Sequence, residues 1–309
     1  VTTKRERAIV VSALKHAAPY ILLFKGKVFV IKAGGEVFAD PELASALVEQ
    51  VGILHQVGIR TVLIHGGGPQ STKLATELGL ETQFVEGRRV TDSESLNVAA
   101  MILNGQINTR ILAACRDLQI PAVGISGVDA GLIRAHKRPP VEGKDGESVD
   151  YGFVGDIDSV EADILRKQLD NGLMPVVSPL SCDESGTLLN INADTVAAAI
   201  AAELGAEKLI LVTGATGILE DINDPTSLIS YIDRKRLKEL REEGILADGM
   251  LPKAAAIDAA IRNGVSRVHV ISYKLADSIL LEVFTNEGTG TLVVDDITAL
   301  TPEEQAADS

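Results

Sequence analysis

The chain has 309 residues but no tryptophan, and aromatic residues make up only 3% of it. Proteins that bind single-stranded nucleic acid stack the bases on aromatic side chains, so this composition disfavours that class. Basic residues are also in the minority, 29 against 43 acidic ones, which gives a formal net charge of −14. DNA and anionic membranes attract the opposite sign. Neither partner is expected, and any bound anion must be held by local basic groups and backbone amides.

Cysteine is scarce as well. Cys115 and Cys182 show no metal-ligand spacing and no framework of bridges. A reducing compartment is therefore expected, the cytoplasm or, in a plant or alga, the plastid stroma. No uninterrupted apolar run reaches the roughly 18 residues of a membrane span, and the amphipathic N-terminus has no convincing secretory cleavage site.

The standard nucleotide fingerprints are missing too. The chain has no G-x-x-x-x-G-K-[ST] motif and no G-x-G-x-x-G after a strand, which disfavours a dinucleotide-dependent dehydrogenase. An HGGG run, present at 65–68, also forms the oxyanion hole of lipase-like hydrolases, but those enzymes need a G-x-S-x-G elbow. The nearest stretch, GISGV at 124–128, has Val128 in place of the second glycine.

Apolar strands and helical segments alternate along the chain. Continuous apolar strands between helices predict an α/β fold with a mostly parallel sheet covered on both faces. The polar residues 136–157 break the alternation and predict a hairpin or excursion, and the acidic tail from 298 is expected to be disordered. Strands are predicted within 27–35 and 59–68 and at 121–126, 174–179, 208–214, 267–272 and 291–295; helices are predicted at 6–24, 41–57, 70–79, 92–117, 158–171, 194–204, 233–243, 253–263 and 276–284.

Two glycine-rich stretches follow predicted strands. Gly34 and Gly35 come after Lys32, and residues 66–68 are three glycines ahead of a helix. The carboxyl ends of strands in open α/β sheets are where ligands bind, and exposed backbone N–H groups at a helix N-terminus favour an anion. Tight strand–helix turns are the alternative explanation. His65, beside the second loop, is interpreted as a structural hydrogen-bonding residue.

Two further stretches carry polar groups at the ends of predicted strands or helices. Arg88 and Arg89 precede a helix cap and suit bidentate recognition of a carboxylate, although a solvated basic pair is the alternative. Asn190, Asn192 and Asp194 alternate before a helix; one is its N-cap, and the others offer donors for a carboxylate and an acceptor that can orient a lysine.

Two features in the C-terminal third point to phosphate. Lys253 lies in the first turn of an Ala-rich helix, where its charge opposes the helix macrodipole unless an anion sits nearby. The stretch from Thr213 to Gly217 follows a buried strand and resembles a phosphate or ribose contact, with a plain turn as the equal alternative.

Six motifs in order make the chain resemble the amino-acid kinase family, and within it the acetylglutamate kinases. The resemblance covers about residues 8–295 and implies an open three-layer α/β/α sandwich with two lobes. The implied divisions are an interlacing helix at 1–24, an N-terminal lobe for substrate binding and dimerisation at 25–187, an ATP-binding lobe at 188–297 and a disordered tail at 298–309. The motifs are KAGG (32–35), HGGGPQ (65–70), GRRVTD (87–92), GFVGDI (152–157), NINAD (190–194) and DGMLPK (248–253).

The resemblance implies ATP-dependent phosphorylation of the side-chain carboxylate of N-acetyl-L-glutamate in arginine biosynthesis. Mg²⁺ would arrive with ATP, and no metal site on the protein is implied. By position, Lys32 and Lys253 would neutralise the transferring phosphoryl group and Asp194 would orient them. The remaining implied contacts are Gly34, Gly35, Thr213 and Gly217 for the nucleotide phosphates, and Gly67, Gly68, Arg89, Asn190 and Asn192 for the substrate.

The resemblance also implies regulation. Arginine-inhibited members carry an N-terminal helix that interlaces dimers into a hexamer, and some members bind a PII-type signalling protein. Tyr20, His269, Glu282 and Gly288 resemble the arginine site. Two departures stand out: Gly214 replaces the family's aspartate, and ISYKLAD at 271–277 replaces an Asp-Gly-Arg run.

Two alternatives share this fold. One is a related carboxylate kinase acting on an aminoadipate derivative or on glutamate. The other is a catalytically weak regulatory or binding protein, which the presence of Lys32, Lys253 and Asp194 disfavours.

Overall fold

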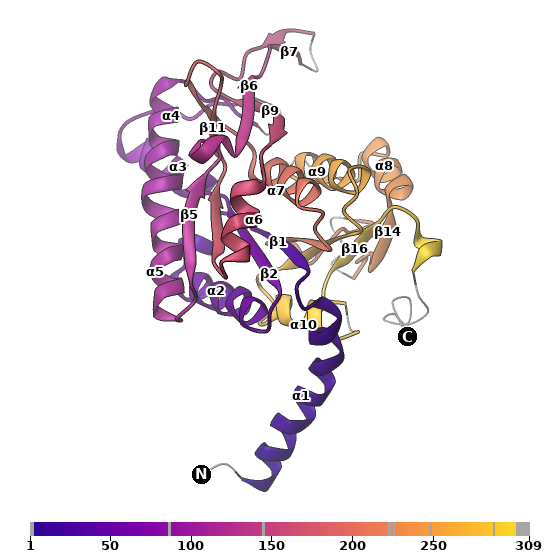
Figure 1. The fold of residues 1–309 in the computed structure, drawn as a ribbon. Coiled ribbons are helices and arrows are strands. Elements are labelled where there is room, and N and C mark those ends of the chain that lie inside the picture. The colour runs from indigo at the N-terminus through magenta and orange to yellow at the C-terminus, as the bar shows by residue number, and fades with distance from the viewer. Residues whose placement is uncertain are drawn as a thin grey trace.

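The computed structural model describes residues 3–85, 88–143, 146–221, 224, 226–246, 249–286 and 288–300, and Figure 1 shows their fold. In this described part the main sheet has eight strands, and only its β15–β16 pair is antiparallel. The strand order is β14 (Tyr231–Asp233), β16 (Thr291–Val294), β15 (Arg267–Ser272), β13 (Lys208–Thr213), β1 (Val28–Ala33), β2 (Arg60–His65), β10 (Met174–Ser178) and β5 (Ala122–Ser126).

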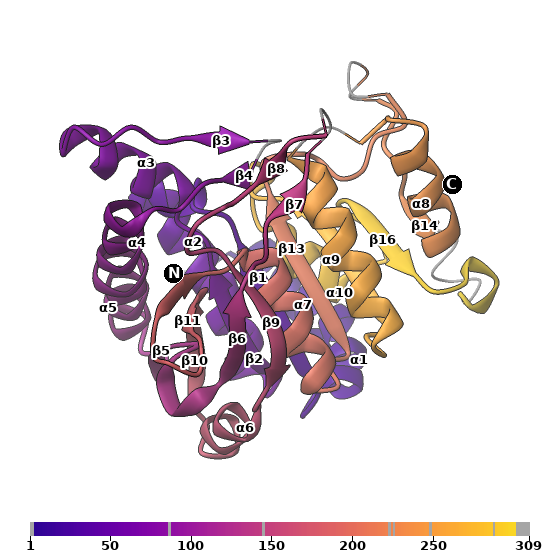
Figure 2. The ribbon, with the colours of Figure 1, turned by 90° about the horizontal axis from the view of Figure 1, so that it is seen from above.

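Helices cover both faces of this sheet, as Figures 1 and 2 show. The strands are buried on both sides because each face packs into its own apolar cluster, so the predicted three-layer α/β/α sandwich is confirmed. One face carries α6 (Asp163–Asp170), α7 (Ala193–Glu203), α8 (Arg234–Glu242) and α9 (Met250–Arg262); the other carries α2 (Pro41–Gln56), α3 (Gly68–Glu77), α4 (Ser93–Ala100), α5 (Thr109–Asp117) and α10 (Ser278–Phe284).

The sheet runs without a break through both predicted lobes. β1, from the predicted N-terminal lobe, pairs in parallel with β13, from the predicted ATP-binding lobe. This register brings the carboxyl end of β1, which carries Lys32, beside the carboxyl end of β13. The division of the chain at 187 and 188 stays a prediction.

The long helix predicted at 92–117 is continuous but not uniform. Between α4 and α5 the chain forms a π-helix, η2 (Met101–Asn108). Single π turns inside α-helices are frequent at functional sites. Short 3₁₀ turns occur elsewhere at η1 (Val37–Ala39), η3 (Asp129–Gly131) and η4 (Ile297–Ala299).

A smaller sheet forms around residues 136–157, where the sequence predicted a hairpin or excursion. Its strand order is β12 (Leu188–Asn190), β11 (Leu180–Cys182), β6 (Ile133–Lys137) and β9 (Gly155–Val160), and β6 and β9 pair antiparallel within it. The predicted helix at 158–171 is therefore wrong at its start, because Asp158 belongs to β9, Ser159 and Val160 pair with β6, and α6 begins at Asp163. Two-stranded pairs form between β3 (Phe84–Val85) and β4 (Arg88–Arg89) and between β7 (Val141–Glu142) and β8 (Ser148–Val149).

The two ends of the chain differ. Helix α1 (Lys4–Phe24) extends away from the body of the molecule (Figure 1) and exposes apolar side chains such as Val10, Leu14 and Leu22. By length and composition alone α1 could also cross a membrane, which is weak evidence for a span so near the N-terminus. At the other end Leu300 is buried, so the tail begins later than the predicted 298; residues 301–309 lie outside the described residues.

Candidate functional site

Two lysines meet one aspartate at the carboxyl edge of the main sheet. Lys32 Nζ lies 2.9 Å from Asp194 Oδ1, and Lys253 Nζ lies 3.0 Å from the same oxygen. All three side chains are buried, with 8%, 6% and 7% of the surface of Lys32, Lys253 and Asp194 exposed. The structure therefore brings together the three residues that the sequence predicted as catalytic.

The electrostatics of this cluster keep the carboxylate charged. Burial acts to raise the pKa of Asp194, but the charges and hydrogen bonds of Lys32 and Lys253 outweigh it and bring that pKa to about 2. Burial foremost, and then the charge of Lys32, lower the pKa of the Lys253 ammonium. Two cations share one anion, so the cluster carries net positive charge that suits the oxygens of a phosphoryl group.

Local sequence places these side chains. Asn192 is the N-cap of α7, and its Oδ1 accepts hydrogen bonds from the amides of Asp194 and Thr195 at 2.9 and 3.1 Å. That cap fixes Asp194 in the first turn, where a carboxylate is favourable. Lys253 occupies the first turn of α9, and Figures 1 and 2 show α7 and α9 packed side by side.

A cavity of about 250 Å³ opens beside Lys32 and Asp194. Its size is below the roughly 300–1,000 Å³ of drug-sized sites and suits a small metabolite. Lys253 binds the same oxygen of Asp194 as Lys32 but is not among the residues that line the cavity. The lining includes these sequence-predicted residues: Gly34, Gly35, Gly67, Gly68, Arg89, Asn190 and Asn192.

The glycines of the two loops differ in what surrounds them. A Cβ on Gly35 would lie 2.9 Å from Cα of Gly67, so the two loops pack on each other. A Cβ on Gly67 would lie 2.8 Å from Ile107 Cδ1 and from Leu103 Cδ2 of the π-helix. Only Gly68 has open space, with no atom within 4 Å. Close approach of a ligand thus explains Gly68 better than Gly67.

Arg89 and Asn190 form the polar rim of the cavity. Arg89 Nη2 donates to the Gly68 carbonyl at 3.1 Å and to Thr72 Oγ1 at 2.5 Å. Its guanidinium also lies over the Phe84 ring, 5.1 Å from the centroid. Burial lowers the pKa of Arg89, but a guanidinium stays charged at neutral pH. Asn190 Nδ2 donates to Thr91 Oγ1 at 3.3 Å.

The opposite end of the cavity is apolar, which the sequence did not reveal. Ala75 of α3, Val98 and Ala99 of α4 and Leu103 of the π-helix line it. These residues recur at helical spacing, which predicts only a core face. The cavity therefore pairs a polar end with a small apolar end.

His65 behaves as the sequence predicted, as a structural residue. It is fully buried, and burial lowers its pKa to about 4. Its Nε2 lies 3.3 Å from Asn108 Nδ2, and Phe38 packs edge-on against the ring. A neutral imidazole in this setting holds the π-helix against β2.

Two predicted nucleotide contacts lie elsewhere. Thr213 and Gly217 do not line the cavity; Thr213 ends β13, and Gly217 is buried against Leu228 and Thr291. Tyr273 occupies the space beside Gly214, its hydroxyl 3.2 Å from where a Cβ would stand. The nucleotide roles of Thr213 and Gly217 stay predictions.

A second cavity, of about 360 Å³, lies near the amino ends of β13 and β15 and the end of α1. Tyr20, His269, Glu282 and Gly288, the four residues of the predicted effector site, all line it. Tyr20 donates a hydrogen bond to Asn286. Lys208 and Arg267 add basic groups to the same wall.

His269 and Glu282 form a buried pair in this second cavity. Lys208 Nζ, which can only donate, lies 3.1 Å from His269 Nε2. His269 Nδ1 therefore carries the proton and donates to Glu282 Oε1 at 2.5 Å. Burial acts to raise the pKa of Glu282, but hydrogen bonds from His269 and Thr289 bring it to about 2. The carboxylate is charged at neutral pH.

Known proteins resemble this chain over most of its length. Residues 27–272 match the model of the amino acid kinase family. An acetylglutamate kinase from Myxococcus xanthus is 45% identical over 288 residues, which are 92% of this chain and 94% of the relative. An acetylglutamate kinase from Symbiobacterium thermophilum is 42% identical, over 92% of this chain and 97% of the relative.

A solved structure shares the arrangement of the elements. N-acetylglutamate synthase from Neisseria gonorrhoeae, complexed with coenzyme A and N-acetyl-glutamate, matches 93% of this chain with a TM-score of 0.81 and 29% identity. This chain spans 63% of that synthase chain. The same synthase complexed with coenzyme A and L-arginine gives a TM-score of 0.80 and 29% identity over 93% of this chain and 65% of the synthase.

Proposed function

The chain belongs to the amino acid kinase family, and we propose that it transfers the γ-phosphoryl group of ATP to the side-chain carboxylate of N-acetyl-L-glutamate in arginine biosynthesis. The observation that carries this proposal is the pair of buried lysines on Asp194 at the edge of a small cavity. The two relatives described above are named for this activity, and the chain matches them over nearly their whole length.

The proposed reaction requires little covalent chemistry from the protein itself. A carboxylate oxygen of the substrate forms a bond to the γ-phosphorus while the bond from that phosphorus to the ADP oxygen breaks, which leaves an acyl phosphate and ADP. The attacking carboxylate is already ionised at pH 7, so no general base is needed. Lys32 and Lys253 stabilise the charge that gathers on the equatorial phosphoryl oxygens.

The cavity accounts for the rest of the substrate. Arg89 and Asn190 at the polar rim suit the main-chain carboxylate and amide of an acylated amino acid. Ala75, Val98, Ala99 and Leu103 offer a place for the acetyl methyl group. Free glutamate, whose ammonium would enter that apolar end, fits less well.

ATP is expected on the Lys253 side of Asp194, since Lys253 lies outside the cavity. Asp194 is occupied by both lysines, and Glu36 also lines the cavity, but among the described residues no group of three or more His, Cys, Asp or Glu side chains could hold a metal ion. We therefore assign Mg²⁺, which supplies further positive charge to the phosphates, to ATP rather than to a set of protein ligands.

A hydroxamate assay tests the activity. The protein is incubated with Mg-ATP and hydroxylamine, which traps an acyl phosphate, and with N-acetylglutamate, glutamate, N-acetylaspartate or N-acetyl-2-aminoadipate. We expect product chiefly from N-acetylglutamate. Product chiefly from glutamate or from the aminoadipate derivative would favour the related carboxylate kinase, and no product from any substrate would leave only the regulatory-protein alternative.

We also propose that arginine binds in the second cavity and inhibits the enzyme. Glu282 offers a carboxylate for a guanidinium, and Lys208 and Arg267 offer positive charge for the arginine carboxylate. The synthase of similar fold was solved with L-arginine, which supports the choice of ligand.

The exposed apolar side chains of α1 support a further proposal, a homo-oligomer in which α1 packs on α1 of a second copy. A homodimer or a hexamer built as a trimer of dimers would cover them. Light scattering of the chain with and without residues 1–24 tests this.

A further inference from the structure

The backbone of residues 151–154 lies between the two parts of the cavity wall that carry Arg89 and Asn190. On one side, the Thr91 amide donates to the Tyr151 carbonyl at 2.9 Å, and the Phe153 amide donates to the Thr91 carbonyl at 2.7 Å. On the other side, the Asn190 amide donates to the Phe153 carbonyl at 2.8 Å. The position of this segment, together with the direct hydrogen bond from Asn190 Nδ2 to Thr91 Oγ1, therefore sets how far the backbone of Asn190 lies from Thr91, which is two residues after Arg89.

The fit of this segment against Thr91 is close. Gly152 has φ of +72°, a conformation that favours glycine, and a Cβ there would clash with the Thr91 carbonyl oxygen. A small displacement of residues 151–154 cannot be absorbed at that contact. It would instead move Asn190, on the other side of the segment.

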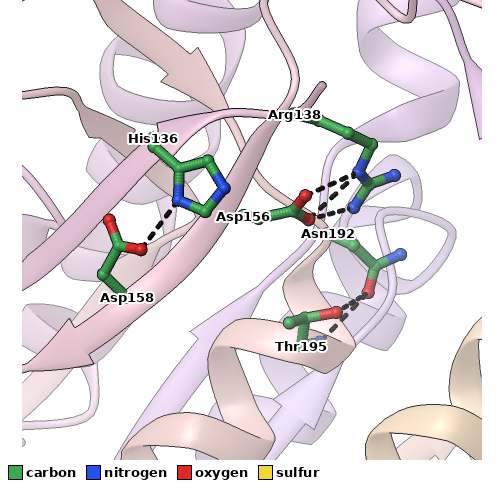
Figure 3. Close-up of polar contacts among 6 residues, drawn as sticks. All are labelled: His136, Arg138, Asp156, Asp158, Asn192 and Thr195. Atoms are coloured by element: carbon green, nitrogen blue, oxygen red, sulfur yellow. Dashed lines mark hydrogen bonds and ion pairs between the residues drawn. The ribbon is translucent and has the colours of Figure 1, made fainter. Parts of the chain in front are cut away.

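Arg138 contacts this segment at Val154 and at Tyr151, and it also binds Asp156, two residues beyond the segment. Its amide donates to the Val154 carbonyl at 2.8 Å. Its guanidinium lies 5.9 Å from the centre of the Tyr151 ring. Its Nε donates to both oxygens of Asp156, at 3.0 and 3.1 Å, and its Nη2 donates to Oδ1 at 2.5 Å. Figure 3 shows this fork of contacts between Arg138 and Asp156.

This pair differs from the other ion pairs of the same two strands. The side chains of Arg138 and Asp156 are 15% and 36% exposed, and their contact is bidentate. By contrast, Arg134 lies 3.8 Å from Glu161, and their side chains are 71% and 56% exposed. Exposed single contacts of that kind contribute little, whereas a shielded bidentate pair fixes geometry.

We propose that Arg138 is a positioning residue for substrate recognition: through its side-chain contacts with Asp156 and Tyr151 it sets the spacing between Arg89 and Asn190 across the cavity. The proposal rests on the proposed function, since it concerns the same substrate. Arg138 is not among the residues that line the cavity, and neither Lys32 nor Lys253 depends on it. Its loss should therefore weaken binding of the phosphoryl acceptor and leave the phosphoryl-transfer charges in place.

Steady-state kinetics of Arg138→Lys, Arg138→Met and Asp156→Asn test this. We expect the KM for N-acetylglutamate to rise about tenfold in Arg138→Met and Asp156→Asn and by less in Arg138→Lys, the loss expected when one hydrogen bond to the acceptor is weakened. The kcat and the KM for ATP should change less than about twofold. Arg138→Lys keeps the positive charge but not the planar, bidentate guanidinium, so its KM for N-acetylglutamate should lie between those of the parent and Arg138→Met. Arg134→Met, on β6, the strand that ends just before Arg138, is the matched control and should behave as the parent.

Calorimetric titration with N-acetylglutamate in the absence of ATP gives a readout independent of turnover. Weaker binding in the variants, with the parent's melting temperature retained in Arg138→Lys or Asp156→Asn, supports the proposal even if Arg138→Met fails to fold. An unchanged acceptor affinity, or equal losses for acceptor and ATP, would overturn it. A parent that shows no activity on N-acetylglutamate would instead refute the proposed function.

Discussion

Lys32 and Lys253 donate to a single oxygen atom, Oδ1 of Asp194, at 2.9 and 3.0 Å. Lys32 ends a central strand and also lines the cavity, whereas Lys253 begins a helix and does not. One carboxylate thus holds together a cation on the acceptor side and a cation on the expected nucleotide side. Because Asp194 has two partners, it keeps one of them when the other is removed.

Lys253→Met should remove one catalytic charge without unfolding the protein. Asp194 keeps its contact with Lys32, so no uncompensated charge is left in the interior. We expect kcat to fall by about 100-fold or more, the usual effect of losing one preorganised electrostatic group. The KM for N-acetylglutamate should stay within about threefold, because Lys253 lies outside the cavity. Initial rates and a melting curve measure both effects.

The matched control for this variant is Lys235→Met on α8, where 85% of the lysine side chain is exposed. It should retain the parent's kcat. A Lys253→Met enzyme with undiminished kcat would remove Lys253 from the catalytic set.

Gly68→Ala and Gly67→Ala should separate activity from stability. The methyl group of Gly68→Ala meets no protein atom within 4 Å, so the fold is expected to persist while binding in the cavity suffers. In Gly67→Ala the methyl group would press on Leu103 and Ile107, and such overpacking costs about 1–3 kcal/mol. Urea unfolding together with kcat/KM distinguishes the two.

Gly105→Ala serves as the glycine control, because a Cβ there also meets nothing within 4 Å and Gly105 does not line the substrate cavity. Equal stability losses in Gly67→Ala and Gly68→Ala would contradict the assignment of separate roles.

His65 should make the stability of the fold depend on pH. Its pKa is about 4 in the folded chain and near 6.5 when exposed, so between these values the unfolded chain binds the additional proton. Stability is therefore lost as the pH falls from about 6.5 toward 4. At pH 5 the loss from this residue is about 2 kcal/mol.

His65→Gln, which cannot titrate, isolates this contribution. The difference in the free energy of unfolding between parent and variant should shrink by about 2 kcal/mol between pH 7.5 and pH 5. A difference that stays constant over this range would show that His65 is charged, or exposed, in the folded state.

Glu282→Gln should abolish the effect of arginine. The guanidinium would lose its ionised partner, so the arginine concentration that halves the activity should rise at least about tenfold. Glu49→Gln, on the exposed side of α2, is the control and should leave inhibition unchanged. If the parent enzyme is indifferent to arginine, the regulatory proposal fails while the catalytic one stands.

The main sheet was predictable because its strands are buried on both faces and read as continuous apolar runs. β1, β2 and β13 fall where the sequence placed them. The small sheet was less predictable, since residues 155–160 mix polar and apolar side chains and contain no continuous apolar run. Their pairing with β6 is decided by contacts between distant segments, which local patterns do not contain.

The catalytic cluster was also predictable, because Lys32 and Asp194 belong to short motifs with fixed places at element ends. The apolar end of the cavity was not, since Val98 and Leu103 look like any core residues of a helix. Arg138 was missed for another reason: its role follows from side-chain contacts made to residues 151 and 156, and an isolated arginine after a strand predicts neither of them.

The π-helix at Met101–Asn108 sets the rotational phase between α4 and α5. An α-helix turns about 100° per residue, and a π turn carries one residue more than an α turn. With that surplus residue, Leu103 faces Gly67 while Asn108 still reaches His65 and the Val176 carbonyl. If the same residues formed a regular α-helix instead, the side chains of α5 would be rotated about the helix axis relative to those of α4. The extra residue of the π turn therefore fixes the orientation of the cavity wall relative to the edge of the sheet.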